Sequence, residues 1–108
     1  MALSTNLIDA TTASPTAGTS VAPATSISDN THTVVVLNPD SANTVYMNFG
    51  AAGGALSANN SVNILPQTSV SFAIGTLSQR AATGSNMIFD ASAGTIDVRI
   101  FYVNGVSS

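Results

Sequence analysis

The sequence predicts an all-β fold, an antiparallel β-sandwich or jelly-roll-like barrel with an extended N-terminal arm. From His32 onward, apolar and polar residues alternate over short segments that Gly, Pro, Asn or Ser separate, as expected for half-buried strands. No stretch of ten residues has the spacing of an amphipathic helix. Ser, Thr, Asn and Gly replace most charged residues, and these types disfavour helices. The 108 residues suffice for one domain.

The beginning of the chain has a different composition. Residues 1–30 are rich in Ser, Thr, Ala and Pro and show no sustained periodicity, which predicts an extended arm followed by a single β-sandwich domain over residues 31–108. Two interpretations of the arm stay open: a disordered terminus, or a segment that becomes ordered on a neighbouring subunit. In the second, Leu3, Leu7 and Ile8 are the anchor, because they form the arm's cluster of large apolar side chains.

The expected strands follow one another between small-residue turns and loops. Pro39 and Asp40 suit the central positions of a type I turn after the first strand. The next segment alternates cleanly, so Val45, Met47 and Phe49 are expected on one face. The expected strands are 32–37, 44–49, 62–65, 69–76, 86–90 and 94–105, and the longest loops are 50–61 and 78–85.

The last expected strand has two distinct faces. Its core side should carry Ile96, Val98, Ile100 and Tyr102, and its outward side should carry Asp97, Arg99, Phe101 and Val103. Asp97 and Arg99 are close enough on that side to form an ion pair. The apolar end of the outward side needs cover, either from a subunit contact or from the chain's own arm. A folded part of about 75 residues has a marginal core, which also favours self-association.

Charge and length exclude several classes of function. Charged residues make up 6 % of the chain, the net charge is −3, and Arg80 and Arg99 are the only cations. This argues against binding to nucleic acid or to an anionic membrane surface, which needs several basic contacts. The chain has no run of eighteen apolar residues that could span a bilayer, and residues 1–18 lack the basic and apolar regions of a secretory signal peptide. Synthesis in a cytoplasm without secretion is expected.

The inventory of catalytic groups is too small for an enzyme. His32 is the only histidine, and its place at a strand start indicates a structural role. The chain has no cysteine, no nucleophile elbow and no phosphate-binding loop. A calcium site built from Asp29, Asn30 or Asp90 is a minor alternative, because no calcium-loop motif is present. We therefore predict no catalytic residues, no cofactor and no metal.

Two loops could instead bind a ligand such as a glycan. Tyr46 is the exposed aromatic candidate, although a cross-strand partner role is the simpler interpretation. Asn59 and Asn60 in the first loop and Arg80 in the second would add polar contacts. The absence of tryptophan counts against carbohydrate binding.

Three segments, 32–50, 69–80 and 94–105, share a strand-and-turn rhythm with a bias toward Asn, Gly, Ser and Thr. In this respect the chain resembles the small structural proteins of tailed bacteriophage particles, namely head decoration (cement) proteins and related fibre modules. The resemblance implies a sandwich or jelly-roll core, often trimeric, that sits where capsid subunits meet and uses an N-terminal arm for contacts. It implies no catalytic residues.

The prediction for function is therefore a viral structural protein. It would be a capsid decoration protein of the virion that binds the major capsid protein on the outside of the phage head, as a homo-oligomer and most simply a trimer, after synthesis in the host cytoplasm. The residues expected to make oligomer or capsid contacts are Leu3, Leu7, Ile8, Phe101 and Val103. The alternative is a carbohydrate- or receptor-binding β-sandwich module of a phage fibre or surface adhesin, with Tyr46, Asn59, Asn60 and Arg80 in its loops.

Overall fold

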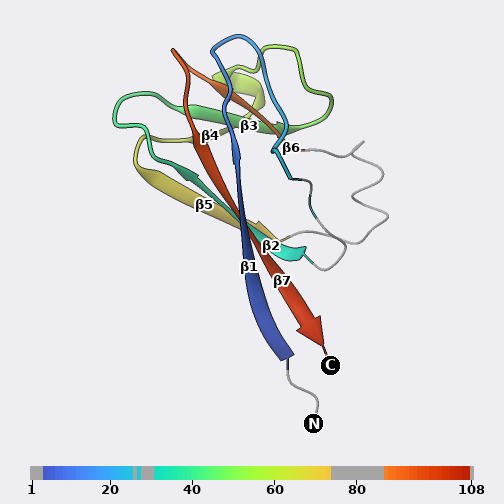
Figure 1. The fold of residues 1–108 in the computed structure, drawn as a ribbon. Coiled ribbons are helices and arrows are strands. Elements are labelled where there is room, and N and C mark those ends of the chain that lie inside the picture. Colours follow the sequence, from blue (N-terminus) through green and yellow to red (C-terminus); the bar gives the residue numbers. More distant parts are fainter. Residues whose placement is uncertain (1–3, 26, 28–30, 74–86, 108) are drawn as a thin grey trace.

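The chain folds into antiparallel sheets with almost no helix, which confirms the all-β prediction (Figure 1). The computed structural model describes residues 4–25, 27, 31–73 and 87–107. Its strands are β1 (Ser4–Ala13), β2 (Thr31–Asn38), β3 (Val45–Phe49), β4 (Val62–Ile64), β5 (Thr68–Ala73), β6 (Met87–Ala91) and β7 (Val98–Ser107). Over the described residues, the helical content is one 3-10 turn, η1 (Ala58–Asn60).

The strands form two sheets. One has four strands in the order β1-β7-β2-β5, and the other has three in the order β4-β3-β6. A jelly roll has two four-stranded sheets, so the jelly-roll part of the prediction is not confirmed. β1 and β7 run side by side toward the end of the molecule where both termini lie (Figure 1).

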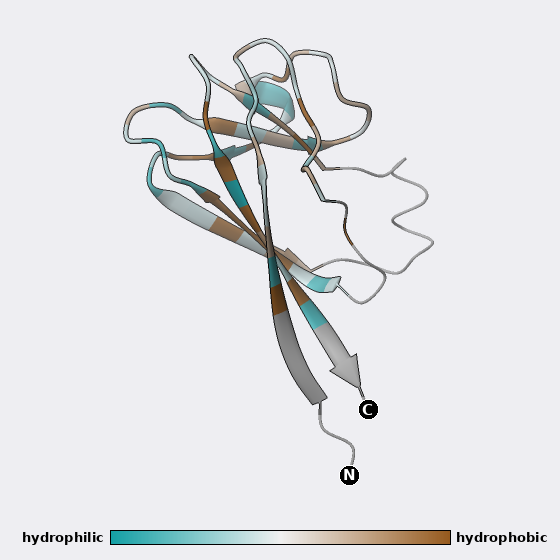
Figure 2. Ribbon diagram, in the orientation of Figure 1, coloured by the Kyte–Doolittle hydropathy of each residue, from teal (hydrophilic) through white to brown (hydrophobic). Residues whose placement is uncertain are grey.

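A single hydrophobic core lies between the two sheets. Along β7, hydrophobic bands are interrupted by hydrophilic ones (Figure 2), and the predicted core side of this segment is buried throughout. Each fully buried Val, Ile or Phe stabilises the fold by about 1.5–3 kcal/mol. The four-stranded sheet supplies Ala13, Val34, Val36, Val98, Ile100 and Tyr102, the three-stranded sheet supplies Val45, Met47, Ile64, Met87, Phe89 and Ala91, and Ile96 enters just before β7.

Phe49 lies on the same side of β3 as Val45 and Met47, as the alternation predicts, but it ends the strand and is 40 % exposed. It packs edge-to-face on Phe72, with ring centroids 6.1 Å apart. All five residues of β6 are buried. β3 covers one edge of β6, and Val21 covers the other through two backbone hydrogen bonds of 2.9 Å with Phe89.

The predicted N-terminal arm is wrong for residues 4–13, which form β1. This strand pairs with β7 along its whole length, from Ser4 opposite Ser107 to Ala13 opposite Val98. The chain then crosses to the second sheet, where Val21 pairs with Phe89, and both Val21 and Ile27 pack against the core. No periodic pattern marks β1, because an edge strand can be held by backbone hydrogen bonds rather than by a buried row of side chains.

Tyr102 ties the crossing segment to the core. Its side chain is 2 % exposed, and its hydroxyl donates a hydrogen bond of 2.6 Å to the carbonyl oxygen of Thr25. Burial raises the pKa of Tyr102 from its ordinary value of 10.0 to about 12. The unfolded chain therefore releases this proton near pH 10 while the folded chain keeps it to about pH 12, so the stabilising contribution of Tyr102 falls across that window.

We expect Tyr102→Phe to lower the free energy of unfolding by about 1 kcal/mol at neutral pH, because it deletes one hydrogen bond. The difference from the unmodified protein should shrink as the pH rises above 10. Urea denaturation of both proteins at about pH 8 and about pH 11.5 measures this change. A difference that stays constant across this range contradicts the assignment.

Candidate docking face

The outward side of the four-stranded sheet carries the strongest candidate for a functional surface. In a strand, alternate side chains point to opposite faces, so the register of the four strands places outward residues in rows. The rows are Ile8–Val103–Thr33–Ala73, Ala10–Phe101–Val35–Ser71 and Thr12–Arg99–Leu37–Ser69.

Five large hydrophobic residues meet on this face, and we call them the outer apolar patch: Ile8, Val35, Leu37, Phe101 and Val103. Ile8 is 65 % exposed, and the other four are half-buried. The chain's N-terminal segment does not cover the patch over its described residues, because β1 lies beside β7 as the next strand. β1 instead widens the face by contributing Ile8 and Ala10.

A shallow hollow of about 280 Å³ lies at the β1 side of the patch, lined by Ala10, Thr11, Thr12, Arg99 and Phe101. Arg99 is the only Lys or Arg in the described part of the chain. The expected ion pair between Asp97 and Arg99 is not formed. Asp97 precedes β7, and its carboxylate accepts a hydrogen bond of 2.7 Å from the Ser14 hydroxyl. The guanidinium of Arg99 therefore lies beside an apolar surface with no carboxylate paired to it among the described residues.

Three of the five predicted contact residues come together on this face. Ile8 is opposite Val103, and Phe101 lies on the same side of β7 two residues away. Leu7 lies in β1, opposite Asn104, and Leu3 lies outside the described residues. That these residues bind a partner stays a prediction.

Val35 and Leu37 also belong to this face, although they were not among the predicted contact residues. Both belong to the unbroken apolar run Val34–Leu37 of β2. An unbroken run indicates a strand with hydrophobic residues on both faces, whereas a strand with one wet face alternates. This apolar run could therefore have predicted that β2 contributes hydrophobic side chains to the outer face as well as to the core.

The predicted ligand-loop residues do not assemble into a comparable surface. Tyr46 is half-buried on β3, opposite Asn63. Asn59 is exposed in η1. The side-chain oxygen of Asn60 accepts hydrogen bonds from the Ser57 backbone N–H at 2.9 Å and from the Ser61 hydroxyl at 2.8 Å, so Asn60 holds its own loop. Arg80 lies outside the described residues.

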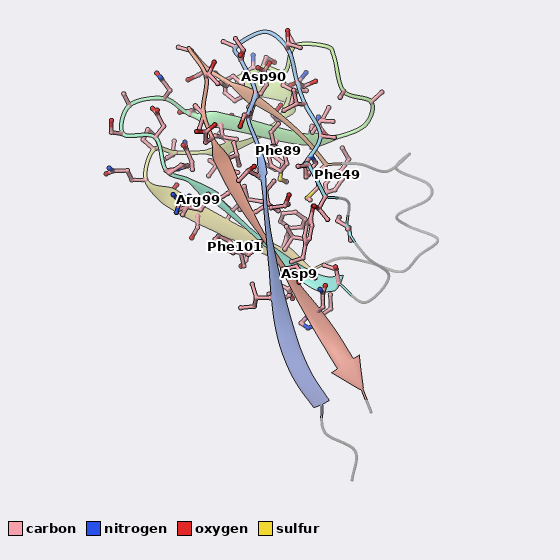
Figure 3. All side chains as sticks on the ribbon, viewed as in Figure 1. Asp9, Phe49, Phe89, Asp90, Arg99 and Phe101 are labelled. Carbon is pink, nitrogen blue, oxygen red and sulfur yellow. The ribbon has the colours of Figure 1, made fainter. Side chains whose placement is uncertain are left out.

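Asp90, the described member of the minor calcium alternative, has a structural role. It is 1 % exposed and lies among the loops at the top of the molecule, well above Asp9 (Figure 3). Its carboxylate accepts three backbone hydrogen bonds, from Gly18 (3.1 Å), Ala91 (2.8 Å) and Leu56 (2.9 Å). Asp29 and Asn30 lie outside the described residues.

Over the described residues, no three His, Cys, Asp or Glu side chains gather as a metal site would require. In the same part of the chain, no helix has the length and apolar character needed to cross a membrane. His32 lies at the start of β2, with Nδ1 2.9 Å from the Thr33 hydroxyl. No known protein family, curated protein or solved structure matches this chain.

Proposed function

We propose that this protein is a capsid decoration protein, a structural component of a phage particle that binds the outside of the head and stabilises contacts between capsid subunits. The outer apolar patch carries this proposal. A contiguous apolar surface on a small soluble domain typically marks a site of interaction with another protein. The patch lies on a broad sheet face with only a shallow hollow, which suits a protein surface better than a small ligand.

The proposed action is mechanical. A protein that binds the assembled shell, and not its separate subunits, stabilises the assembled state by mass action. Among the described residues, Arg99 is the one cation beside the patch, so the contacts of the patch should depend little on ionic strength. We also propose that no catalytic residue or cofactor takes part, since the function needs only buried area. As part of the same proposal, we propose that the chain is related to phage decoration proteins and shares their β-sandwich architecture.

The alternative, a glycan- or receptor-binding module, has less support. Asn60 is engaged within its own loop. Tyr46 is half-buried on β3, in the other sheet from the patch. The two functions differ in the surface they need, so substitutions on the patch separate them.

We expect the protein to co-sediment with phage particles from the culture that produces it, and to rebind after it has been stripped from them. Phe101→Ser should weaken rebinding about 30-fold, because truncating a central hydrophobic contact costs about 2 kcal/mol. Quantitative pelleting of stripped particles with increasing protein measures the affinity.

Val62→Ser is the matched control. Val62 is 49 % exposed on β4 of the other sheet, so this substitution also removes an exposed hydrophobic side chain. Its rebinding should equal that of the unmodified protein. Rebinding of Phe101→Ser at full affinity sinks the proposal, as does a particle fraction that lacks the protein. Specific glycan binding that Phe101→Ser retains favours the alternative.

A further inference from the structure

We infer that the outer edge of β1 is a self-association site, at which β1 of one copy pairs antiparallel with β1 of a second copy. This adds a subunit contact to the proposed function and rests on a different part of the molecule, the edge of the sheet rather than its face. β1 is at the end of the order β1-β7-β2-β5, so one side of its backbone is paired with β7, and no strand among the described residues pairs with the other side.

One hydrogen bond identifies the backbone groups that point outward. The carbonyl oxygen of Thr12 accepts a hydrogen bond of 2.9 Å from the N–H of Ala24, which lies on the side away from β7. In an antiparallel strand the N–H and C=O of one residue point to the same side, and the side alternates along the strand. Asn6, Ile8 and Ala10 therefore also present their backbone groups to the outer edge. Over the described residues, the crossing segment bonds to β1 only near its C-terminal end, through Ala24 and through the N–H of Thr25, which donates to the Thr11 hydroxyl at 3.1 Å.

This edge lacks the features that normally prevent strand pairing. Soluble proteins protect edge strands with lysine, proline, bulges or short length. β1 has ten residues, no lysine and no proline, and its register with β7 is continuous. Its one charged side chain, Asp9, accepts a hydrogen bond of 2.6 Å from Asn104, whose buried side chain marks the inner side of the sheet. The edge thus offers backbone donors and acceptors without a repelling charge.

The occupant that fits is a second β1. Two antiparallel copies of one strand are related by a two-fold axis. The outward N–H groups of each copy then meet the outward C=O groups of the other. With the axis at Ile8, Ile8 of one copy lies opposite Ile8 of the other. The backbone groups of Asn6 in one copy then exchange hydrogen bonds with those of Ala10 in the other. The 65 % exposed side chain of Ile8 would then be covered on the outer face, where it neighbours Val103. The two outer apolar patches would join into one surface.

This geometry predicts a dimer, whereas the phage resemblance implies a trimer. We expect light scattering across a dilution series to give twice the chain mass of 10.8 kDa. Ile8→Lys should give a monomer at the same concentrations, because it sets two like charges against each other. Val62→Lys, on the other sheet, is the matched control and should stay dimeric.

Two further variants test the dimer without adding a charged side chain, which could by itself disturb folding. Ala10→Pro removes an N–H that points to the outer edge, so it should abolish the dimer and leave urea unfolding nearly unchanged. Ile8→Cys should form an intermolecular disulfide on oxidation, because paired Cα atoms are about 5.5 Å apart in such a ladder and the chain has no other cysteine. Leu65→Cys, 58 % exposed beyond β4, should not form one.

A monomer or a trimer for the unmodified protein overturns the inference, as does a dimer that survives both Ile8→Lys and Ala10→Pro. The proposed function fails separately. Phe101→Ser should lose particle binding and keep the dimer, and a dimer formed by a protein that binds no particles leaves the inference standing while the proposed function fails.

Discussion

Asp90→Asn is expected to lower the free energy of unfolding by about 2–4 kcal/mol at neutral pH. The carboxylate of Asp90 is buried and accepts N–H groups from three separate parts of the chain: Gly18, Leu56 and the adjoining Ala91. Hydrogen bonds to a charged group contribute more than neutral ones. An amide in its place turns an NH₂ group toward at least one of these N–H donors, which leaves that donor without an acceptor.

We expect most of this loss to come from the two hydrogen bonds that tie separate loops to Asp90. Gly18 lies between β1 and β2 with a positive φ of 93°, and Leu56 lies between β3 and β4. Urea denaturation of Asp90→Asn and of Asp97→Asn compares this buried carboxylate with an exposed one. Asp97 is exposed and, among the described residues, bonds to the exposed Ser14 hydroxyl, so its variant should lose no more than about 1 kcal/mol. Equal losses for the two variants would show that Asp90 does not act as a buried acceptor.

Asn38→Asp is expected to destabilise the fold at least as strongly, because it adds a buried charge where Asp90→Asn removes one. Asn38 is fully buried at the end of β2, and its amide nitrogen donates to the carbonyl oxygens of Asn43 (2.8 Å) and Ile64 (2.9 Å). Its side-chain oxygen accepts the N–H of Asp40 at 3.0 Å. An ionised carboxylate of the same shape would face two carbonyl oxygens. We expect a loss of about 3–5 kcal/mol at pH 7 from this uncompensated buried charge.

The pH dependence of this variant distinguishes charge from shape. Burial and the two carbonyl oxygens raise the folded-state pKa of the introduced carboxyl above its unfolded value of about 3.9. Relative to the unmodified protein, the loss should therefore be small near pH 4 and grow as the pH rises toward 7. Urea denaturation at both pH values measures this difference. Asn38→Ala is the control, since its loss should not vary with pH over that range.

The turn after Asn38 illustrates how local chemistry supports these contacts. Asp40 accepts the backbone N–H groups of Ala42 (3.0 Å) and Asn43 (2.6 Å), and these bonds lower the pKa of Asp40 below its ordinary value. The sequence predicted a turn here because Pro and Asp favour such positions. It did not predict that Asn38 would be buried, since an Asn before a Pro-Asp turn usually reads as part of the loop.

The sequence by itself determined the all-β class and the two faces of the last strand. Alternation with period two is a property of neighbouring residues, so Val98, Ile100 and Tyr102 could be assigned to the core, and Phe101 and Val103 to the outside, before any partner strand was known. The small number of charged residues also follows directly from the sequence, and it limits the chemistry that any surface of this chain can perform.

Only the tertiary structure decided which strands lie together. β1 is held to β7 through backbone groups that every residue carries, so its residues show no pattern that distinguishes a paired edge strand from an unpaired arm. The same holds for Asp90, whose partners Gly18 and Leu56 lie 72 and 34 residues away along the chain. The outer apolar patch likewise exists because long-range register sets Val35 beside Phe101, and a shift of one residue would turn either side chain to the opposite face.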